Sequence, residues 1–544
     1  MPEPWIVNFP SPEGCGMADM RKPQTKITYA TMNAEQIDSL HQEFDDELEH
    51  SRGLLGQTHP MWINGRAVQA SDQFDDRSPI DTRILVGRFQ KGSAAHVRDA
   101  VAAARAAYPA WSGLPWQDRV ARVRRVVDAI RDHRAELVVL MAYETGKSRL
   151  ECFGDVEEAA DLMAYCCDQV EQHAGFAQQM GAFGPEEDNR SVMRPYGVWA
   201  VISPFNFPFA LSVGPSGGAL VAGNTVVFKP ATETPLLGYK LVEMTLEAGL
   251  PPGVFNFVTG PGSTVGQELI DNPDIRGIVF TGSKDVGMNL IRSNGARPAP
   301  RPVITEMGGK NPAVVMASAD LDKATDGVMR SAFGATGQKC SACSRIYVAR
   351  EVRERFVELL IEKTRRLEVG NPLERDVFTG PLINANAVTT YEAAIASAVR
   401  DGGRILIGGR RITDEPFNHG YFVEPTVIDG LPREHALFTD ELFVPITVVA
   451  DVISLDEAID LANRTEYGLT AGIFTSDEDE IARFFDRVEA GVLYANRRGG
   501  ATSGAWPGIN PFGGWKGSGS TGRGAGGPHY VQQFFREQSR VVIR

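Results

Sequence analysis

The chain has few cysteines and no long hydrophobic run. Six of its 544 residues are cysteine, and two of these are adjacent, at Cys166 and Cys167. So sparse a set does not form the dense disulfide framework of small secreted proteins, so we expect reduced thiols. No run of about 18 apolar residues occurs, and the start Met-Pro-Glu-Pro-Trp lacks the basic and then apolar order of a signal peptide. We therefore expect a cytoplasmic protein.

Blocks of positive charge are also missing. Lysine and arginine number 55 against 69 aspartate and glutamate, which gives a net charge of −14. No Lys/Arg run has the length of a stripe that follows phosphates, so nucleic acid and anionic membranes are excluded as expected partners. Part of the acidic excess is local, in residues 35–49, and predicts a solvated helix face.

The length and the order of apolar segments predict more than one domain. A single core stops growing at about 250–300 residues, so 544 residues indicate two or more units. The first 55 residues or so contain one amphipathic helix, with Leu40, Phe44 and Leu48 at helical spacing, which we expect to pack on the body of the protein. A long helical pattern follows from residue 94 to 147.

Two regions alternate strand and helix patterns, which is typical of α/β architecture with a parallel, doubly wound sheet. The first has β-branched runs at 198–202, 225–228, 254–258 and 278–280, and its strand-to-helix turns are where a nucleotide is expected. The second runs from 312 to about 493. The stretches 186–194 and 539–544 predict exposed strands, whose edges commonly join a partner subunit.

Three residues offer the parts of a covalent reaction on an aldehyde. Oxidation by a dinucleotide needs an adduct, because hydride leaves readily from a tetrahedral carbon that bears an oxyanion. Cys340 is the candidate nucleophile, presented by the loop 334–338. Glu306, ahead of two glycines that leave room for a water and for the carboxylate to reorient, is the candidate general base. The amide of Asn206 is the candidate oxyanion donor, with the Cys340 N–H.

Each of these residues alone has a simpler interpretation. Cys340 alone would be an inert buried thiol, Glu306 a surface residue beside a helix, and Asn206 a turn former between prolines. Cys343, three residues after Cys340, also allows a metal or redox Cys-x-x-Cys pair. No second Cys-x-x-Cys and no His-x3-5-His occurs, so no metal is expected.

The cofactor candidates follow successive strands. Lys229 ends a strand and is placed to reach ribose hydroxyls or a 2′-phosphate, with Thr232 just beyond. The Gly-rich turns at 260–266 and 280–287 differ from the G-x-G-x-x-G fingerprint, but two such turns support a pyrophosphate at a helix N-terminus. The full set of cofactor candidates is Ser203, Pro204, Phe205, Lys229, Thr232, Gly262, Gly266, Phe280, Gly282, Ser283, Glu441 and Phe443.

These motifs together resemble the aldehyde dehydrogenase superfamily, in order and over roughly residues 60 to 535. They are Pro-Phe-Asn206-Phe-Pro, Phe-Lys229-Pro, Phe-Thr-Gly-Ser at 280–283, Glu306-Met-Gly-Gly-Lys, Gly-Gln-Lys-Cys340 and Glu441-Leu-Phe-Val-Pro. The resemblance implies that Glu441 holds the nicotinamide ribose, with Phe443 beside it. It also implies a Rossmann-type dinucleotide-binding domain, an α/β catalytic domain and a β-strand oligomerisation element.

We place the domains as follows. Residues 1–55 form an N-terminal extension, 56–185 and 200–307 the dinucleotide-binding domain, 308–505 the catalytic domain, and 186–199 with 524–544 the oligomerisation strands. A homodimer or higher homo-oligomer is expected. Lys229 serves either NAD or NADP, and the resemblance favours NAD.

Within the superfamily the chain most resembles the 1-pyrroline-5-carboxylate dehydrogenases, the branch that oxidises L-glutamate γ-semialdehyde to L-glutamate in proline catabolism. The segments that carry this likeness are 338–345, Gly504-Ala505 ahead of 511–514, and 526–530. A substrate with an α-carboxylate and an ammonium needs both kinds of partner. The substrate candidates are Ser341, Gly504 and Ala505 for the carboxylate, Phe207 and Phe512 for the stem, and Asp155 for the ammonium.

Two tryptophans depart from the pattern of that branch. Trp506-Pro507 replaces a small aliphatic pair after Gly504-Ala505, and Trp515 follows Gly513-Gly514. A large indole there could reshape the pocket, which leaves another semialdehyde, or an aliphatic or aromatic aldehyde, open as substrate. A CoA-acylating enzyme is a further alternative that the presence of Glu306 argues against. A non-catalytic structural member of the fold is the remote one.

Overall fold

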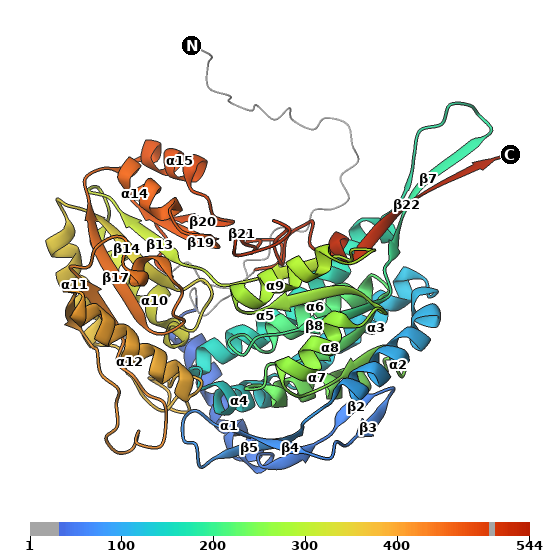
Figure 1. The fold of residues 1–544 in the computed structure, drawn as a ribbon, viewed down its shortest axis with the longest axis horizontal. Helices are drawn as coiled ribbons and strands as arrows, with labels where there is room; N and C mark the ends of the chain where they lie inside the picture. The colour runs from blue at the N-terminus through green and yellow to red at the C-terminus, as the bar shows by residue number, and fades with distance from the viewer. Residues whose placement is uncertain (1–31, 500–505) are drawn as a thin grey trace.

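The computed structural model describes residues 32–499 and 506–544. Figure 1 shows two α/β bodies side by side and an arm of long strands that projects from one of them. Both bodies are built on a seven-stranded sheet, and the arm is a three-stranded sheet. The α/β fold class expected from the alternating pattern is therefore confirmed.

The first body is built on a mostly parallel sheet, buried on both faces. Its spatial order is β12 (Val303–Glu306), β11 (Ile275–Thr281), β8 (Val198–Ile202), β9 (Thr225–Lys229), β10 (Phe255–Phe257), β2 (Met61–Ile63) and β3 (Arg66–Val68). Strands β8 to β12 are parallel, and β2 runs antiparallel to β10. Chain order runs outward in both directions from the β8/β11 pair, and at such a reversal a ligand crevice is expected at the carboxyl ends of the strands.

Helices cover both faces of this sheet. One face packs against α2 (Ala94–Ser112), α8 (Gln267–Asp271) and α9 (Lys284–Gly295). The other packs against α6 (Ala210–Val221) and α7 (Pro235–Glu247), with α3 (Trp116–Asp132), α4 (Arg134–Thr145) and α5 (Arg149–Gln172) beyond them. A small sheet of β1 (Gln57–His59), β5 (Leu85–Gln90) and β4 (Gln73–Arg77) lies at the base of this body.

The N-terminal helix α1 (Ala34–Gly53) packs on the first body, as its amphipathic pattern predicts. Asn33 and Gln36 close a capping box at its start. Phe44 is fully buried, and the Arg149 guanidinium lies 4.2 Å from the centroid of its ring. Arg149 also pairs with Asp45 at 2.8 Å. The apolar face of α1 is thereby fixed to the start of α5.

The second body has the same layered plan. Its sheet runs in the order β15 (Arg404–Ile407), β16 (Thr426–Asp429), β17 (Ile446–Val452), β14 (Cys343–Ala349), β13 (Asn311–Val315), β19 (Thr470–Phe474) and β20 (Val492–Ala495). All neighbours are parallel except β15 and β16. Its helices are α10 (Leu321–Phe333), α11 (Arg353–Arg365), α12 (Ala385–Arg400), α13 (Ala436–Thr439), α14 (Leu455–Asn463) and α15 (Glu478–Arg487). A short pair, β18 (Tyr467–Gly468) with β21 (Trp515–Lys516), lies beside it.

The projecting arm joins segments far apart in sequence. Strand β7 (Glu187–Pro195) pairs antiparallel with β22 (Phe535–Ile543) on one side and with β6 (Ala177–Gln179) on the other. Two of the expected domain boundaries are therefore wrong in detail. Residues 198 and 199 begin β8 of the first sheet, because Val198 and Trp199 pair there with β9 and β11. Residues 177–179, assigned to the first domain, belong to the arm.

Within residues 32–499 and 506–544, no helix combines the length and the apolar character that a bilayer crossing needs.

Candidate active site

The predicted nucleophile lies in a tight turn between α10 and β14. The turn is entered through a 3-10 segment, Gly334–Gly337, in which Ala335 and Thr336 have φ of 47° and 56°. Gly337 follows with φ of 68°, and a Cβ there would lie 2.7 Å from the Pro445 Cα. This left-handed backbone and close approach require glycine at 337. They carry the chain from the end of α10 to Cys340.

Asn311 fixes the turn from the neighbouring strand. Its Nδ2 donates to the carbonyl oxygens of Cys340 and Ala342, at 2.8 and 3.0 Å. Its Oδ1 accepts from the Thr470 N–H at 3.0 Å. This role of Asn311 was not expected from the sequence, although the residue follows directly on the Glu306-Met-Gly-Gly-Lys motif.

The residue Cys340 is partly exposed, whereas the described cysteines Cys152, Cys166, Cys167 and Cys343 are buried. Burial, then the nearby carboxylates of Glu441 and Glu306, raise the pKa of Cys340 to about 12. Hydrogen bonds from the hydroxyl and the N–H of Ser341 oppose this rise. Because both carboxylates act electrostatically on the thiol, Glu441 and Glu306 lie near the Cys340 sulfur. The thiol is therefore protonated at neutral pH, and Ser341 is positioned to stabilise the thiolate when it forms.

Glu306 ends β12 at the edge of the first sheet. Burial raises the pKa of its carboxyl group to about 8, and the Gly514 N–H, which donates to Oε2 at 3.1 Å, opposes that rise. A carboxyl group with a pKa near the working pH is suited to general-base catalysis. Its position near Cys340 agrees with the role expected of it.

The glycines after Glu306 serve a purpose different from the one expected. A Cβ on Gly308 would lie 1.8 Å from the Glu441 Oε2, and one on Gly309 would lie 2.4 Å from the Cys340 carbonyl oxygen. The space that we assigned to a water and to movement of Glu306 therefore holds the Glu441 carboxylate and the nucleophile turn. The Gly309 N–H donates to the Glu441 Oε1 at 2.9 Å.

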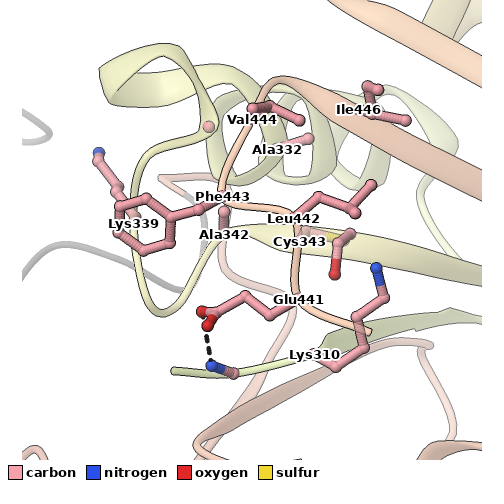
Figure 2. Close-up of a pocket in the computed structure, with 13 residues that line it drawn as sticks. Lys310, Ala332, Lys339, Ala342, Cys343, Glu441, Leu442, Phe443, Val444 and Ile446 are labelled. Carbon is pink, nitrogen blue, oxygen red and sulfur yellow. Dashed lines mark hydrogen bonds between the residues drawn. The ribbon is translucent and has the colours of Figure 1, made fainter. Parts of the chain in front are cut away.

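Glu441 and Phe443 come from the second body and reach the site through the loop between α13 and β17. Figure 2 shows the Glu441 carboxylate directed at the Gly309 amide, with Phe443 and Ala342 lining the same small pocket of about 20 Å³. Burial raises the pKa of Glu441 to about 7. The Phe443 ring stands edge-on to Phe205, with centroids 5.7 Å apart. Two cofactor candidates from different bodies thus meet.

The candidates from the first body line the carboxyl edge of its sheet at the strand-order reversal. Ser203 follows β8, and its N–H donates to the Lys229 carbonyl at 3.1 Å. Pro204 and Phe205 continue that loop. Lys229 ends β9, and burial lowers the pKa of its ammonium group to about 8 while the Glu233 charge opposes this. Thr232 is exposed just beyond.

The two Gly-rich turns differ in what they require. Phe280 lies near the end of β11, and a Cβ on Gly282 would lie 2.6 Å from its ring. Ser283 is the N-cap of α9. In contrast, Gly262 and Gly266 bound a single π-helical turn with open space where a Cβ would be. The protein itself therefore does not require glycine at 262 and 266, which leaves close approach of a ligand as their expected use.

Asn206 lies in the loop between β8 and α6, with 6% of its surface exposed. Within the described residues, no hydrogen-bond partner is recorded for its side-chain amide, while its main-chain carbonyl accepts from the Lys147 Nζ at 3.1 Å. The amide is thus free to donate to an oxyanion.

Asp155 is not where its expected role requires it. It is fully buried in α5, its Oδ2 pairs with the Lys147 Nζ at 2.9 Å, and its Oδ1 accepts from the Ala210 N–H at 2.7 Å. Both oxygens are engaged, so the expectation that Asp155 meets a substrate ammonium is wrong in this structure. A mid-helix acid gave no indication of the lysine that it would face.

The carboxylate beside the nucleophile turn is instead Glu151. Its Oε1 accepts from the Lys339 Nζ at 2.8 Å and its Oε2 from the Ala335 N–H at 3.0 Å. Glu151 was not among the candidates from the sequence. Its place one turn before Asp155 on the same helix, and so on the same helix face, could have indicated it. Residues 335 and 339 both lie in the turn just before Cys340, so Glu151 connects α5 to the turn that carries it.

The remaining substrate candidates are only partly placed. The Phe207 ring lies 4.1 Å from the Lys147 Nζ, and Phe512 is partly buried opposite Ala525. Gly504 and Ala505 lie outside the described residues. Of the two unexpected tryptophans, Trp506 is buried and Trp515 is 49% exposed, so the second one does not fill a pocket.

Comparison with known proteins agrees with this geometry. The aldehyde dehydrogenase family profile matches residues 66–539. This chain belongs to the aldehyde dehydrogenase family. The expected family and reaction class, dehydrogenation of an aldehyde, are thereby confirmed.

Similar proteins are named more specifically. The 1-pyrroline-5-carboxylate dehydrogenase of Anoxybacillus flavithermus is 36% identical over 500 residues, which cover 91% of this chain and 95% of that protein. The solved Thermus 1-pyrroline-5-carboxylate dehydrogenase with bound NAD has a TM-score of 0.90 at 31% identity, over 97% of this chain and all of that one. Proline utilization A of Bdellovibrio bacteriovorus also has a TM-score of 0.90 at 33% identity, but this chain spans only 54% of its length.

Proposed function

We propose that this aldehyde dehydrogenase oxidises L-glutamate γ-semialdehyde to L-glutamate with NAD+. The observation that carries the chemistry is the convergence of Cys340, Glu306 and Glu441, which come from separate segments, with the two carboxylates both raising the pKa of the Cys340 thiol. The substrate is supported by the relatives named 1-pyrroline-5-carboxylate dehydrogenase, which match this chain over nine-tenths of its length.

In the proposed reaction the Cys340 thiol gives its proton to solvent water and the sulfur adds to the aldehyde carbon, giving a thiohemiacetal oxyanion. The Asn206 amide and the Cys340 N–H donate to that oxygen. NAD+, when bound, accepts the hydride that leaves this carbon. Glu306 then takes a proton from water, whose oxygen adds to the thioester, and the carboxylic acid leaves as the Cys340 sulfur is released.

The residues at the sheet edge fit a dinucleotide. Lys229 is almost fully buried, and its Nζ contacts the Pro230 carbonyl at 2.9 Å, so it is held where it can donate further to ribose hydroxyls. Glu233 lies close enough to influence Lys229 electrostatically. A carboxylate there would repel a 2′-phosphate, which supports NAD+ over NADP+. Glu441, oriented by the Gly309 N–H, would accept from the other ribose.

The substrate side is proposed around the nucleophile turn. Ser341 adjoins Cys340, whereas Gly504 and Ala505 lie outside the described residues. We keep all three as the proposed partners of the α-carboxylate. With Asp155 engaged elsewhere, we propose Glu151, which accepts from the Ala335 N–H of the turn, as the partner of the ammonium group. Its present partner is Lys339, so the substrate ammonium would share that carboxylate.

We further propose a homo-oligomer in the cytoplasm, assembled through the arm. Strand β22 exposes Val541, Val542 and Ile543, at 60, 47 and 71% of their surface. Apolar side chains on a projecting edge strand favour pairing with another copy. Sedimentation of a chain that ends at residue 534 tests this proposal. If that chain formed particles with as many subunits as the intact chain, assembly through the arm would be wrong.

A steady-state screen tests the substrate. L-glutamate γ-semialdehyde is compared with succinate semialdehyde and with simple aliphatic and aromatic aldehydes, and we expect the first to have the highest kcat/KM. Comparable kcat/KM for an aldehyde that lacks both the α-carboxylate and the amine would overturn the assignment. Cys340→Ala is expected to abolish turnover with every aldehyde, and retained dehydrogenase activity would overturn the mechanism.

A further inference from the structure

A buried ion pair at the start of α5 holds the Asn206 loop at two points. Lys147 and Asp155 are 5% and 0% exposed at their side chains, and their charged atoms lie 2.9 Å apart. From this pair the Lys147 Nζ reaches the Asn206 carbonyl oxygen at 3.1 Å, and the Asp155 Oδ1 reaches the Ala210 N–H at 2.7 Å. The cation thus holds one end of residues 206–210 and the anion holds the other.

The carbonyl oxygens of Phe207 and Phe209 accept bonds from the first turn of α6, at 3.1 Å from the Leu211 N–H and 2.9 Å from the Val213 N–H, but these bonds do not reach Asn206. Pro204 and Pro208 have no N–H to donate, so the loop between β8 and α6 cannot be fixed by a strand ladder at those positions. Ala210 is the first residue of α6, and its N–H has no partner within the helix. Asp155 accepts that bond and complements the positive end of the helix. The Lys147 Nζ also lies 4.1 Å from the Phe207 ring centroid, so the residue after Asn206 is held too.

We propose that Lys147, fixed by Asp155, is a positioning residue that aims the Asn206 amide at the oxyanion. This inference rests on the proposed role of Asn206 in the reaction. Lys147 contacts neither substrate nor cofactor in this scheme and acts through the main chain of Asn206. Because reacting groups must be aligned closely, a misplacement of about 1 Å can cost roughly 10²-fold in rate.

The location of the pair extends its effect beyond one loop. One turn after Lys147, Glu151 holds the Lys339 Nζ and the Ala335 N–H beside Cys340. The first turn of α5 therefore supports both the oxyanion donor and the nucleophile turn. Arg149, between them, ties the same turn to α1 through Asp45 at 2.8 Å.

Two double variants separate positioning from folding. Lys147→Met with Asp155→Leu removes the clamp but replaces a buried ion pair by apolar groups of similar size, which commonly preserves stability. Lys147→Gln with Asp155→Asn keeps a donor for the Asn206 carbonyl and an acceptor for the Ala210 N–H without charge. We expect the first to lower kcat about 10²-fold with a smaller change in KM, and the second to stay within about tenfold of the parent.

The matched control is Lys240→Met, which breaks another largely buried lysine–carboxylate pair, at 2.9 Å from Glu136, away from the loop. Its kcat should stay within about twofold of the parent. Equal kcat for the Met/Leu variant and the parent would overturn the proposal. So would a Gln/Asn variant as impaired as the Met/Leu variant, since the hydrogen bonds would then not be what matters.

A cycle with Asn206→Ala completes the test. If Lys147 acts through Asn206, the Met/Leu change should reduce kcat by less than about threefold in the Asn206→Ala background. A loss as large as in the parent would overturn the positioning role while leaving the role of Asn206 intact. In contrast, an Asn206→Ala enzyme with parental kcat would overturn the proposed function itself. If the Met/Leu variant does not fold, Lys147→Met with Asp155→Asn, which still removes the donor to the Asn206 carbonyl but keeps an acceptor for the Ala210 N–H, is carried through the same cycle and judged by the same two outcomes.

Discussion

The pKa of Glu306 predicts how release of the acyl group depends on pH. Burial raises that pKa to about 8. About a tenth of the Glu306 carboxyl is then ionised at pH 7, half at pH 8 and about nine-tenths at pH 9. Because only the ionised form accepts a proton from water, hydrolysis of the Cys340 acyl-enzyme should rise about tenfold from pH 7 to pH 9 and then level off.

Ester hydrolysis measures this step without a dehydrogenation. With p-nitrophenyl acetate, acylation of Cys340 gives a burst of nitrophenol, and the steady rate that follows reports deacylation. The product is read at its isosbestic wavelength so that its own ionisation does not enter. Glu306→Gln should retain the burst and lower the steady rate at pH 9 by roughly 10²-fold, the typical value of a general base.

Glu306→Gln also supplies the correction for direct attack by hydroxide, which rises with pH in both proteins. The difference between the two steady rates should follow a single ionisation near pH 8. Parallel profiles of the parent and Glu306→Gln from pH 6.5 to 9.5 would refute the reasoning, because the carboxylate would then not be the base. A Glu306→Gln protein without a burst would refute the separation of acylation from deacylation.

Three further predictions follow from buried groups elsewhere. Burial, then the Glu144 charge, raises the pKa of Asp76 well above its usual range, and burial raises the pKa of Glu144 to about 8. The folded protein therefore holds protons that the unfolded chain releases, so the contribution of this pair to stability is fully present below about pH 4 and is lost as pH rises to 8 and beyond. Asp76→Asn should make the free energy of unfolding less dependent on pH and raise it at pH 8.5 by about 1 kcal/mol or more. Thermal unfolding at several pH values measures this, and the same pH dependence as in the parent would contradict it. Gly308→Ala displaces the Glu441 carboxylate and should raise the KM for NAD+ about tenfold, whereas Gly309→Ala presses on the Cys340 carbonyl and should mainly lower kcat; identical kinetic effects of the two would contradict this assignment. Arg149→Ala removes the buried partner of Asp45 and the cation over Phe44 and should cost roughly 3 kcal/mol in urea unfolding, with the exposed Glu35→Gln as control, and a cost equal to that of the control would show that α1 is held by other contacts.

The sequence alone determined the fold class and the family, and it supplied the candidates for the reacting groups. Strands β8, β9 and β11 contain apolar runs because both of their faces are buried. They can therefore be recognised from the sequence without tertiary information. Cys340, Glu306 and Lys229 could be chosen as candidates from the sequence because each lies in a short motif whose residue types suit one chemistry. The amphipathic helix at 34–53 could likewise be predicted, because its apolar residues recur at helical spacing within a short stretch of sequence.

Tertiary structure decided which side chains engage one another. Asp155 and Glu151 lie one turn apart on the same helix, and nothing in their local sequence tells which one faces Lys147 and which one faces the nucleophile turn. The purpose of Gly308 and Gly309 depends on Glu441 and Cys340, which arrive from distant segments. The boundary at 198–199 likewise depends on pairing with β9 and β11. Local pattern fixes what a residue can do, whereas its partner is fixed by the packing of elements that are far apart along the chain.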